Sequence, residues 1–149
     1  MAENEQLMEI LNKQVANWTV LYTKLHNYHW YVKGPNFLSL HAKFEELYNL
    51  ANDYLDELAE RLLALNGNPV ATLKGSLELS SVQEASGNES TEEMVQGTAN
   101  DFAMIAKELE EAIGLANRIG DDATADMFIN IQETLDKNIW MLNAFLGRR

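Results

Sequence analysis

The sequence predicts an all-α protein, a four-helix bundle in which one long connection separates two helical hairpins. Apolar residues recur with helical spacing in four long segments, at 7–32, 37–62, 94–119 and 128–146. Between the second and third segments, residues 70–89 show no long period and are rich in Ser and Gly. Amphipathic helices of roughly 25 residues cannot bury their apolar faces alone, so four of them in one chain favour a bundle.

The first hairpin is delimited by residues that stop helices. Gly34 is a natural left-handed stop for the first helix, and Pro35 discourages its continuation. Asn36 can cap the second helix. The second helix ends at a cluster of helix breakers, Asn66-Gly67-Asn68-Pro69.

The second hairpin carries similar signals. Ser90 followed three residues later by Glu93 fits a capping box at the start of the third helix. Gly120 is expected to end that helix, and either Asp121 or Asp122 to cap the last one. We therefore expect two short turns and one long crossover.

The crossover decides the topology. Residues 73–82 form either a short helix or an irregular segment, and a connection of this length usually spans a distance. Two antiparallel hairpins joined by one long connection make the ferritin-like arrangement. The 149 residues are the size of one domain, so we assign residues 1–149 to a single ferritin-like four-helix bundle.

Composition narrows the class of protein. Eleven basic and 23 acidic residues give a net charge of −12, which repels nucleic acid and anionic membranes and favours cations, unless it is only a solubilising surface. The chain has no cysteine, which excludes disulfides and thiolate metal sites and fits a cytoplasmic protein. Its acidic start does not resemble a signal peptide, and no apolar run approaches the ~18 residues that span a bilayer.

The histidines are confined to one stretch. All three, His26, His29 and His41, lie within 16 residues. A turn centred near Pro35 places His29 six residues before it and His41 six residues after it. Residues equidistant from the turn of an antiparallel hairpin lie near the same level, so we expect His29 and His41 side by side, where neutral imidazoles can bind a transition metal.

Two carboxylates complete a candidate ligand set, but at a distance. Asp56 and Glu60 are four residues apart and share a helix face. His41 lies 15 residues before Asp56, about 22 Å away at ~1.5 Å rise per residue, so one chain cannot join them at one metal. If they form one site, it lies between two chains, and a two-fold interface makes two such sites. At ~100° per residue, His41, Glu45, Asp56 and Glu60 fall within about 100° of one another, beside the apolar stripe.

A plainer interpretation stays open on the spacing alone. Asp56 and Glu60 then form a solvated acidic face near Arg61, and the histidines pack at helix ends. No Glu stands three residues before a histidine, so the Glu-x-x-His motif of di-iron sites within one bundle is missing.

Three neighbouring residues have two interpretations each. His26 shares a face with His29 and either serves the site, as an additional ligand or as a residue behind the ligands, or is a packed or surface histidine. Trp30 and Tyr31 are expected to be core or interface aromatics, and beside an oxidising metal they could also intercept radicals.

At these residues the chain resembles the Dps-type miniferritins, the family of the DNA-binding protein from starved cells. The resemblance covers nearly the whole chain and the helix plan. The matching stretches are His29-Trp30-Tyr31, Gly34–Phe37, Leu40-His41, Asp56–Arg61 and Asp136–Met141.

The resemblance implies a ferroxidase, an enzyme that oxidises Fe²⁺, usually with hydrogen peroxide, and stores ferric oxide inside a dodecameric shell. It implies di-iron centres shared between two subunits, with His29 and His41 from one subunit and Asp56 and Glu60 from its mate. The family often has Asp at the position of Glu45, a second-metal ligand, where this chain has the longer Glu. Storing the iron would suppress Fenton chemistry and oxidative damage.

Related shells have acidic pores at their three-fold axes, near the start of the last helix. Asp121, Asp122 and Asp126 match that region. Ordinary capping and compensation of the helix dipole would explain the same residues, and the two roles are compatible.

DNA binding is the part of the resemblance that the sequence does not favour. Family members that bind DNA often use a Lys-rich tail, whereas the first twelve residues here contain no Lys or Arg and the C-terminus offers only Arg148-Arg149. We expect weak or absent DNA binding, because binding needs many phosphate contacts.

Two rival functions remain. One is a DNA-compacting nucleoid protein with incidental iron binding, which the net charge and missing tail disfavour. The other is a signalling bundle that phosphorylates a histidine. Such domains typically have Lys and Gly shortly after the histidine, and His41-Ala42-Lys43-Phe44 does not match that pattern.

Overall fold

The computed structural model describes residues 2–148, and these fold into helices and turns with no strand among them. The helices are α1 (Glu3–Tyr31), α2 (Phe37–Ala64), α3 (Leu73–Leu79), α4 (Thr91–Arg118) and α5 (Asp122–Phe145). Four long helices and one short helix in the crossover confirm the predicted all-α class and topology. No helix within residues 2–148 combines the length and the apolar character that crossing a membrane requires.

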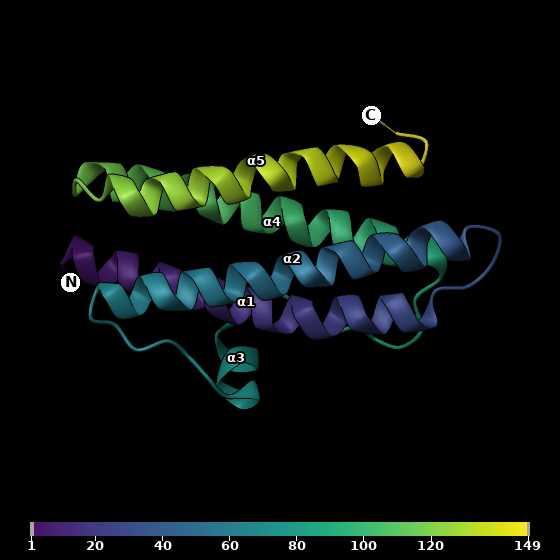
Figure 1. The fold of residues 1–149 in the computed structure, drawn as a ribbon, viewed down its shortest axis with the longest axis horizontal. Helices are drawn as coiled ribbons and strands as arrows, with labels where there is room; N and C mark the ends of the chain where they lie inside the picture. The colour runs from purple at the N-terminus through teal and green to yellow at the C-terminus, as the bar shows by residue number, and fades with distance from the viewer. Residues whose placement is uncertain (1, 149) are drawn as a thin grey trace.

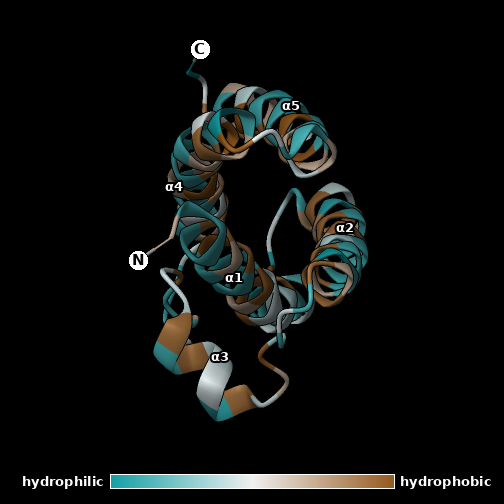
Figure 2. Cartoon of the chain, turned by 90° about the vertical axis from the view of Figure 1, so that its left-hand side faces the viewer, coloured by the Kyte–Doolittle hydropathy of each residue, from teal (hydrophilic) through white to brown (hydrophobic). Residues whose placement is uncertain are grey.

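The bundle consists of two antiparallel hairpins packed against each other. Helices α1 and α2 form one pair and α4 and α5 the other, and the crossover runs between them (Figure 1). Seen along the bundle axis, α3 lies outside the four long helices, against α1 (Figure 2).

The core lies between the long helices and is aromatic at its centre. Trp18 is fully buried, with ring centroids 5.0 Å from Tyr54 and 5.9 Å from Phe102, so α1, α2 and α4 meet at one residue. Phe44 and Phe128 are also fully buried. Burying such rings removes 150–250 Å² of apolar surface each, which fixes the relative position of the helices that carry the polar groups described below.

The helix ends follow most of the predicted signals. Ser90 and Glu93 form the capping box of α4. Asp121, rather than Asp122, caps α5 by accepting a hydrogen bond from the Thr124 N–H. Asn36 occupies the N-cap position of α2, as predicted, but its side chain makes no capping hydrogen bond.

The turns use left-handed residues, although not always where a helix stops. Gly120 has φ +80°, directly after the C-cap of α4, as predicted. Helix α1 ends at Tyr31, before Gly34, whose φ of +103° serves the turn itself. At the end of α2 the left-handed residue is Asn66, and a Cβ on Gly67 would lie 2.3 Å from a Leu62 side-chain carbon.

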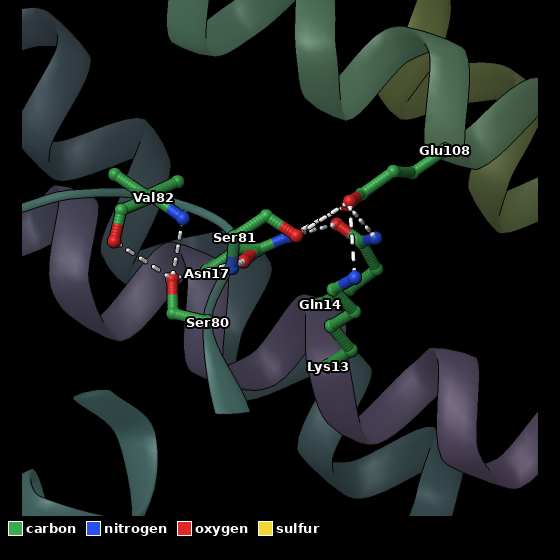
Figure 3. Close-up of polar contacts among 7 residues, drawn as sticks. All are labelled: Lys13, Gln14, Asn17, Ser80, Ser81, Val82 and Glu108. Atoms are coloured by element: carbon green, nitrogen blue, oxygen red, sulfur yellow. Dashed lines mark hydrogen bonds and ion pairs between the residues drawn. The ribbon is translucent and has the colours of Figure 1, made fainter. Parts of the chain in front are cut away.

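The crossover is anchored by a partly buried polar cluster (Figure 3). Asn17 on α1 accepts hydrogen bonds from the Ser80 hydroxyl and the Ser81 N–H, and donates to the Glu108 carboxylate on α4. Gln14 and the Ser81 hydroxyl also donate to Glu108. These bonds hold the crossover on the bundle and satisfy the fully buried amide of Asn17.

Candidate metal centre

His29 and His41 lie side by side across the α1–α2 turn. Their rings are stacked, with centroids 3.7 Å apart and planes inclined by 13°. His29 is buried at 6% exposure near the end of α1, and His41 is half-buried in the first turns of α2. The arrangement agrees with their equal distances from the turn.

Each histidine is held by the backbone of the other. Nδ1 of His29 lies 2.6 Å from the His41 carbonyl oxygen, and Nδ1 of His41 lies 2.7 Å from the His29 carbonyl oxygen. A carbonyl oxygen only accepts, so each Nδ1 carries the proton. In the neutral ring, Nε2 therefore holds the lone pair, which is the form that binds a metal.

Glu45 stands closest to this pair among the predicted carboxylates. Its Oε1 lies 3.9 Å from Nε2 of His29, and its side chain is about half exposed, at 54%. Glu45 follows His41 by one helical turn, so it approaches the nitrogen that the backbone leaves available. This position is compatible with the ligand role that we predicted for it.

Asp56 and Glu60 are exposed on the far part of the same helix. Helix α2 is continuous from Phe37 to Ala64, so the 15 residues from His41 to Asp56 span about 22 Å. The structure therefore does not bring the four predicted ligands together in one chain. No three His, Asp or Glu side chains converge as a metal-binding group within residues 2–148.

Aromatic rings extend the histidine pair on both sides. Phe37 stacks on His41 at 4.9 Å, and Tyr48 meets His29 edge-on at 5.2 Å. Tyr48 in turn stacks on His26, with centroids 3.7 Å apart. We did not predict Phe37 or Tyr48 as part of the site. Their positions, four residues before and seven residues after His41, share its helix face and could have indicated them.

The other predicted neighbours are accounted for in part. Nδ1 of His26 donates to the Tyr22 carbonyl oxygen at 2.7 Å, and its ring packs on Tyr48. Trp30 and Tyr31 are not core residues in this chain, because they are 65% and 67% exposed. Their alternative assignment to an interface stays a prediction.

The three candidate pore aspartates differ in their surroundings. Asp121 accepts a hydrogen bond from Nη2 of Arg61 at 2.9 Å and from the Thr124 hydroxyl. Burial works to raise the pKa of Asp121, but the bonds from Thr124 and the Arg61 charge outweigh it and hold the pKa below its usual range. Asp122 and Asp126 are exposed on the first turns of α5. Arg61 thus pairs with Asp121 and not with the neighbouring Glu60.

Comparisons with known proteins agree with this fold. The ferritin-like domain family matches residues 8–149. General stress protein 20U of Bacillus subtilis is 59% identical over 97% of this chain and 99% of its own length. The crystal structure of a Dps protein from Bacillus brevis superposes with a TM-score of 0.96 at 51% identity, covering 98% of both chains.

The chain belongs to the Dps-type miniferritins. A third relative has the same fold. Dps from Listeria innocua, in a crystal soaked with zinc, superposes with a TM-score of 0.92 at 42% identity, covering 95% of this chain and 97% of that one. The family resemblance drawn from the histidine and carboxylate motifs is thereby confirmed, and so is the ferritin-like fold.

Proposed function

We propose that this miniferritin is a ferroxidase that detoxifies and stores iron in the cytoplasm. Two Fe²⁺ ions bind at a site shared between two subunits of a dodecamer, hydrogen peroxide oxidises them, and ferric oxide collects inside the shell. His29 and His41 come from one subunit and Asp56 and Glu60 from its mate. Glu45 is the further carboxylate of the second iron.

The observation that carries the proposal is the pair of reciprocal Nδ1 bonds between His29 and His41. They present two adjacent Nε2 lone pairs before any metal arrives, so little side-chain entropy is lost on binding. A pair of nitrogens is an incomplete set for iron. Exposed carboxylates on a distant part of α2 can complete it only from another chain.

The donor set suits the reaction. Imidazole binds Fe²⁺ well, while hard carboxylate oxygens favour Fe³⁺, so the set stabilises the oxidised product relative to the reactant. Each Fe²⁺ gives one electron and hydrogen peroxide accepts two. With two protons, two Fe²⁺ and one peroxide yield two Fe³⁺ and two waters. Pairing the irons avoids the one-electron reduction of peroxide, which releases hydroxyl radical.

Iron entry is assigned to the exposed aspartates of α5. Asp122 and Asp126 are one helical turn apart and both exposed, so a ring of symmetry-related copies would attract Fe²⁺. Asp121 already neutralises Arg61 and caps α5, so we assign it a smaller share of this role.

Oxidation of Fe²⁺ by purified protein tests the proposal. We expect consumption of one peroxide per two Fe²⁺, and a rate that falls by more than about 10-fold in His29→Ala and in Asp56→Ala, since even residues behind the ligands cost 10–100-fold. Glu57→Ala is the matched control. It removes an exposed carboxylate next to Asp56 that points about 100° away around the helix, and its rate should stay that of the wild type.

Two results would contradict the proposal. A chain that elutes as a monomer in size-exclusion chromatography cannot build a site between subunits. Wild-type rates in both His29→Ala and Asp56→Ala would show that iron is oxidised elsewhere.

A further inference from the structure

We propose that Tyr48 is a positioning residue for the metal-binding face of His29, and that His26 holds Tyr48 in place. The inference rests on the proposed metal site, because it concerns how one ligand of that site is oriented. It assigns a function to an aromatic cluster that packs against the edge of the apolar core and lies beside the predicted ligands.

The starting point is the freedom left to His29. Its Nδ1 bond to the His41 carbonyl restrains the ring, but a combined rotation about the two side-chain bonds can keep this hydrogen bond and still redirect Nε2. The direction of the Nε2 lone pair therefore depends on what packs against the ring. Stacking on His41 restrains one face of the ring. A further restraint comes from Tyr48, whose ring plane stands at 84° to the His29 plane with centroids 5.2 Å apart.

Tyr48 is itself restrained by an anchored partner. The His26 ring lies over it at 3.7 Å and 20°. His26 is restrained both by its Nδ1, which donates to the Tyr22 carbonyl oxygen 2.7 Å away, and by the rings packed against it. Tyr22 and Trp30 pack against the His26 ring at 4.6 and 5.2 Å. Tyr48 is therefore held between His26, which the backbone and two neighbouring rings restrain, and His29, which is predicted to bind metal.

The helical spacing places Tyr48 and His26 beside the predicted ligands. Tyr48 follows His41 by seven residues on α2, and His26 precedes His29 by three on α1, so both lie on the face that carries the ligands. Each contact with a histidine is made by the ring. A leucine at position 48 would lack the flat surface that His26 covers, and it would leave space beside His29.

The physical consequence is a loss of preorganisation. In Tyr48→Leu the His29 ring samples several orientations, and metal binding must then select one of them. The entropy cost of fixing the His29 side chain is then no longer met when the protein folds, and it opposes metal binding instead. Groups that orient a metal ligand typically contribute 10–100-fold to affinity, so we expect Co²⁺ to bind about 10-fold more weakly.

The experiment is a titration of the assembled protein with Co²⁺, followed by its d–d absorption, which also reports the ligand geometry. Tyr48→Leu should weaken binding, whereas Tyr48→Phe, which keeps the ring, should bind like the wild type. His26→Ala should weaken binding in the same direction, and it provides the test if Tyr48→Leu fails to assemble, because His26 is only half-buried. A crystal structure of Tyr48→Leu should show the His29 ring rotated from its present position.

Two further variants separate positioning from general destabilisation and from failure of the site itself. Phe102→Leu alters a fully buried ring of the core that touches no histidine, and it should lower stability without changing Co²⁺ affinity. His29→Ala should abolish the Co²⁺ spectrum. Wild-type binding by Tyr48→Leu, an equal loss in Tyr48→Phe, or an equal loss in Phe102→Leu overturns the inference while the site stands. Wild-type binding by His29→Ala overturns the proposed site.

Discussion

At the scale of single residues, hydrogen bonds to backbone groups decide which side-chain atoms are available for chemistry. The two carbonyl bonds of His29 and His41 reserve Nδ1 of each ring and leave Nε2 for a ligand. Because each acceptor is a backbone atom, replacing one histidine removes a stacking partner but leaves the other histidine its hydrogen bond. The two side chains are therefore coupled through ring packing rather than through hydrogen bonding.

Glu89 is a second side chain held by backbone groups, and in this case we expect the stability of the protein to depend on pH. It accepts the N–H groups of Ser86 and Gly87 and the hydroxyl of Tyr28, the residue before His29. Burial opposes the charged form, but the backbone bonds dominate and hold the pKa of Glu89 at about 2, against 4.5 for an unperturbed Glu. Because the pKa of Glu89 is lower in the folded state than in the unfolded state, its ionised form stabilises the fold at pH values above the unfolded-state pKa. That stabilisation is lost as the pH falls through the folded-state pKa.

We therefore expect Glu89→Gln to lower the free energy of unfolding by roughly 1.5–3 kcal/mol near neutral pH. The difference from wild type should shrink as pH falls from about 4.5 toward about 2, where wild-type Glu89 also becomes neutral. Denaturant unfolding across this range measures it. Glu92→Gln removes an exposed carboxylate in the same region that accepts none of these bonds, and its difference from wild type should be smaller. A difference that persists at pH 2 would contradict the assignment.

At the scale of helices, one arginine ties the two hairpins together. Arg61, near the end of α2, donates to Asp121 and to the Thr124 hydroxyl at the start of α5, with both distances 2.9 Å. Asp121 also caps α5. The carboxylate thus satisfies a helix end and holds α5 against the helix that carries Asp56 and Glu60.

Replacing Asp121 should separate this structural role from iron entry. We expect Asp121→Ala to lower the free energy of unfolding by about 0.5–2 kcal/mol, the usual cost of a lost helix cap. Asp122→Ala removes a carboxylate that makes no cap bond, and it should leave stability near that of the wild type while slowing iron uptake into the shell. Equal stability of the two variants in thermal melts would remove the structural role of Asp121.

How far the sequence predicted each element depends on whether its signal is local. The Ser90–Glu93 box and the Asp121 cap were predictable because their partners lie three residues away. Asn36 marked the start of α2 correctly, but its residue type does not force the side chain to make a capping bond. The hydrogen bonds that Asn17 makes with Ser81 and with Glu108 join residues 64 and 91 positions apart in the sequence. No local sequence pattern predicts them.

In the candidate site, too, the features set by local spacing were predictable and the side-chain contacts were not. The adjacency of His29 and His41 followed from counting residues on either side of one turn. Their reciprocal carbonyl bonds did not follow, because they depend on the side-chain conformations that the surrounding rings impose. Tyr48 was missed because an aromatic residue on a helix face is usually interpreted as packing.

At the scale of the whole molecule, charge sets the expected behaviour toward DNA. The net charge is −12 per chain, and the first twelve residues carry no Lys or Arg. We expect no retardation of duplex DNA in gels at ~150 mM salt, because binding needs several phosphate contacts by basic residues. Retardation that weakens steeply with added salt would contradict this. It would favour the alternative function of a nucleoid protein that compacts DNA.

The proposed site is complete only when two subunits assemble. Shells that mix two mutant chains test this requirement directly. One chain would carry His29→Ala and His41→Ala, and a second would carry Asp56→Ala and Glu60→Ala. Each alone should be inactive. In a mixed two-fold pair, one site combines both defects, but the other joins the intact histidines of one chain to the intact carboxylates of its mate.

Random co-assembly of equal amounts should therefore restore about a quarter of the wild-type ferroxidase sites, because half of the pairs are mixed and each has one intact site of two. Two affinity tags isolate shells that contain both chains, and size-exclusion chromatography should place them near twelve times the 16.9 kDa chain mass. Shells mixed after separate assembly are the control and should stay inactive. A site built within one chain would give no recovery in either mixture, since every chain would lack half of its ligands.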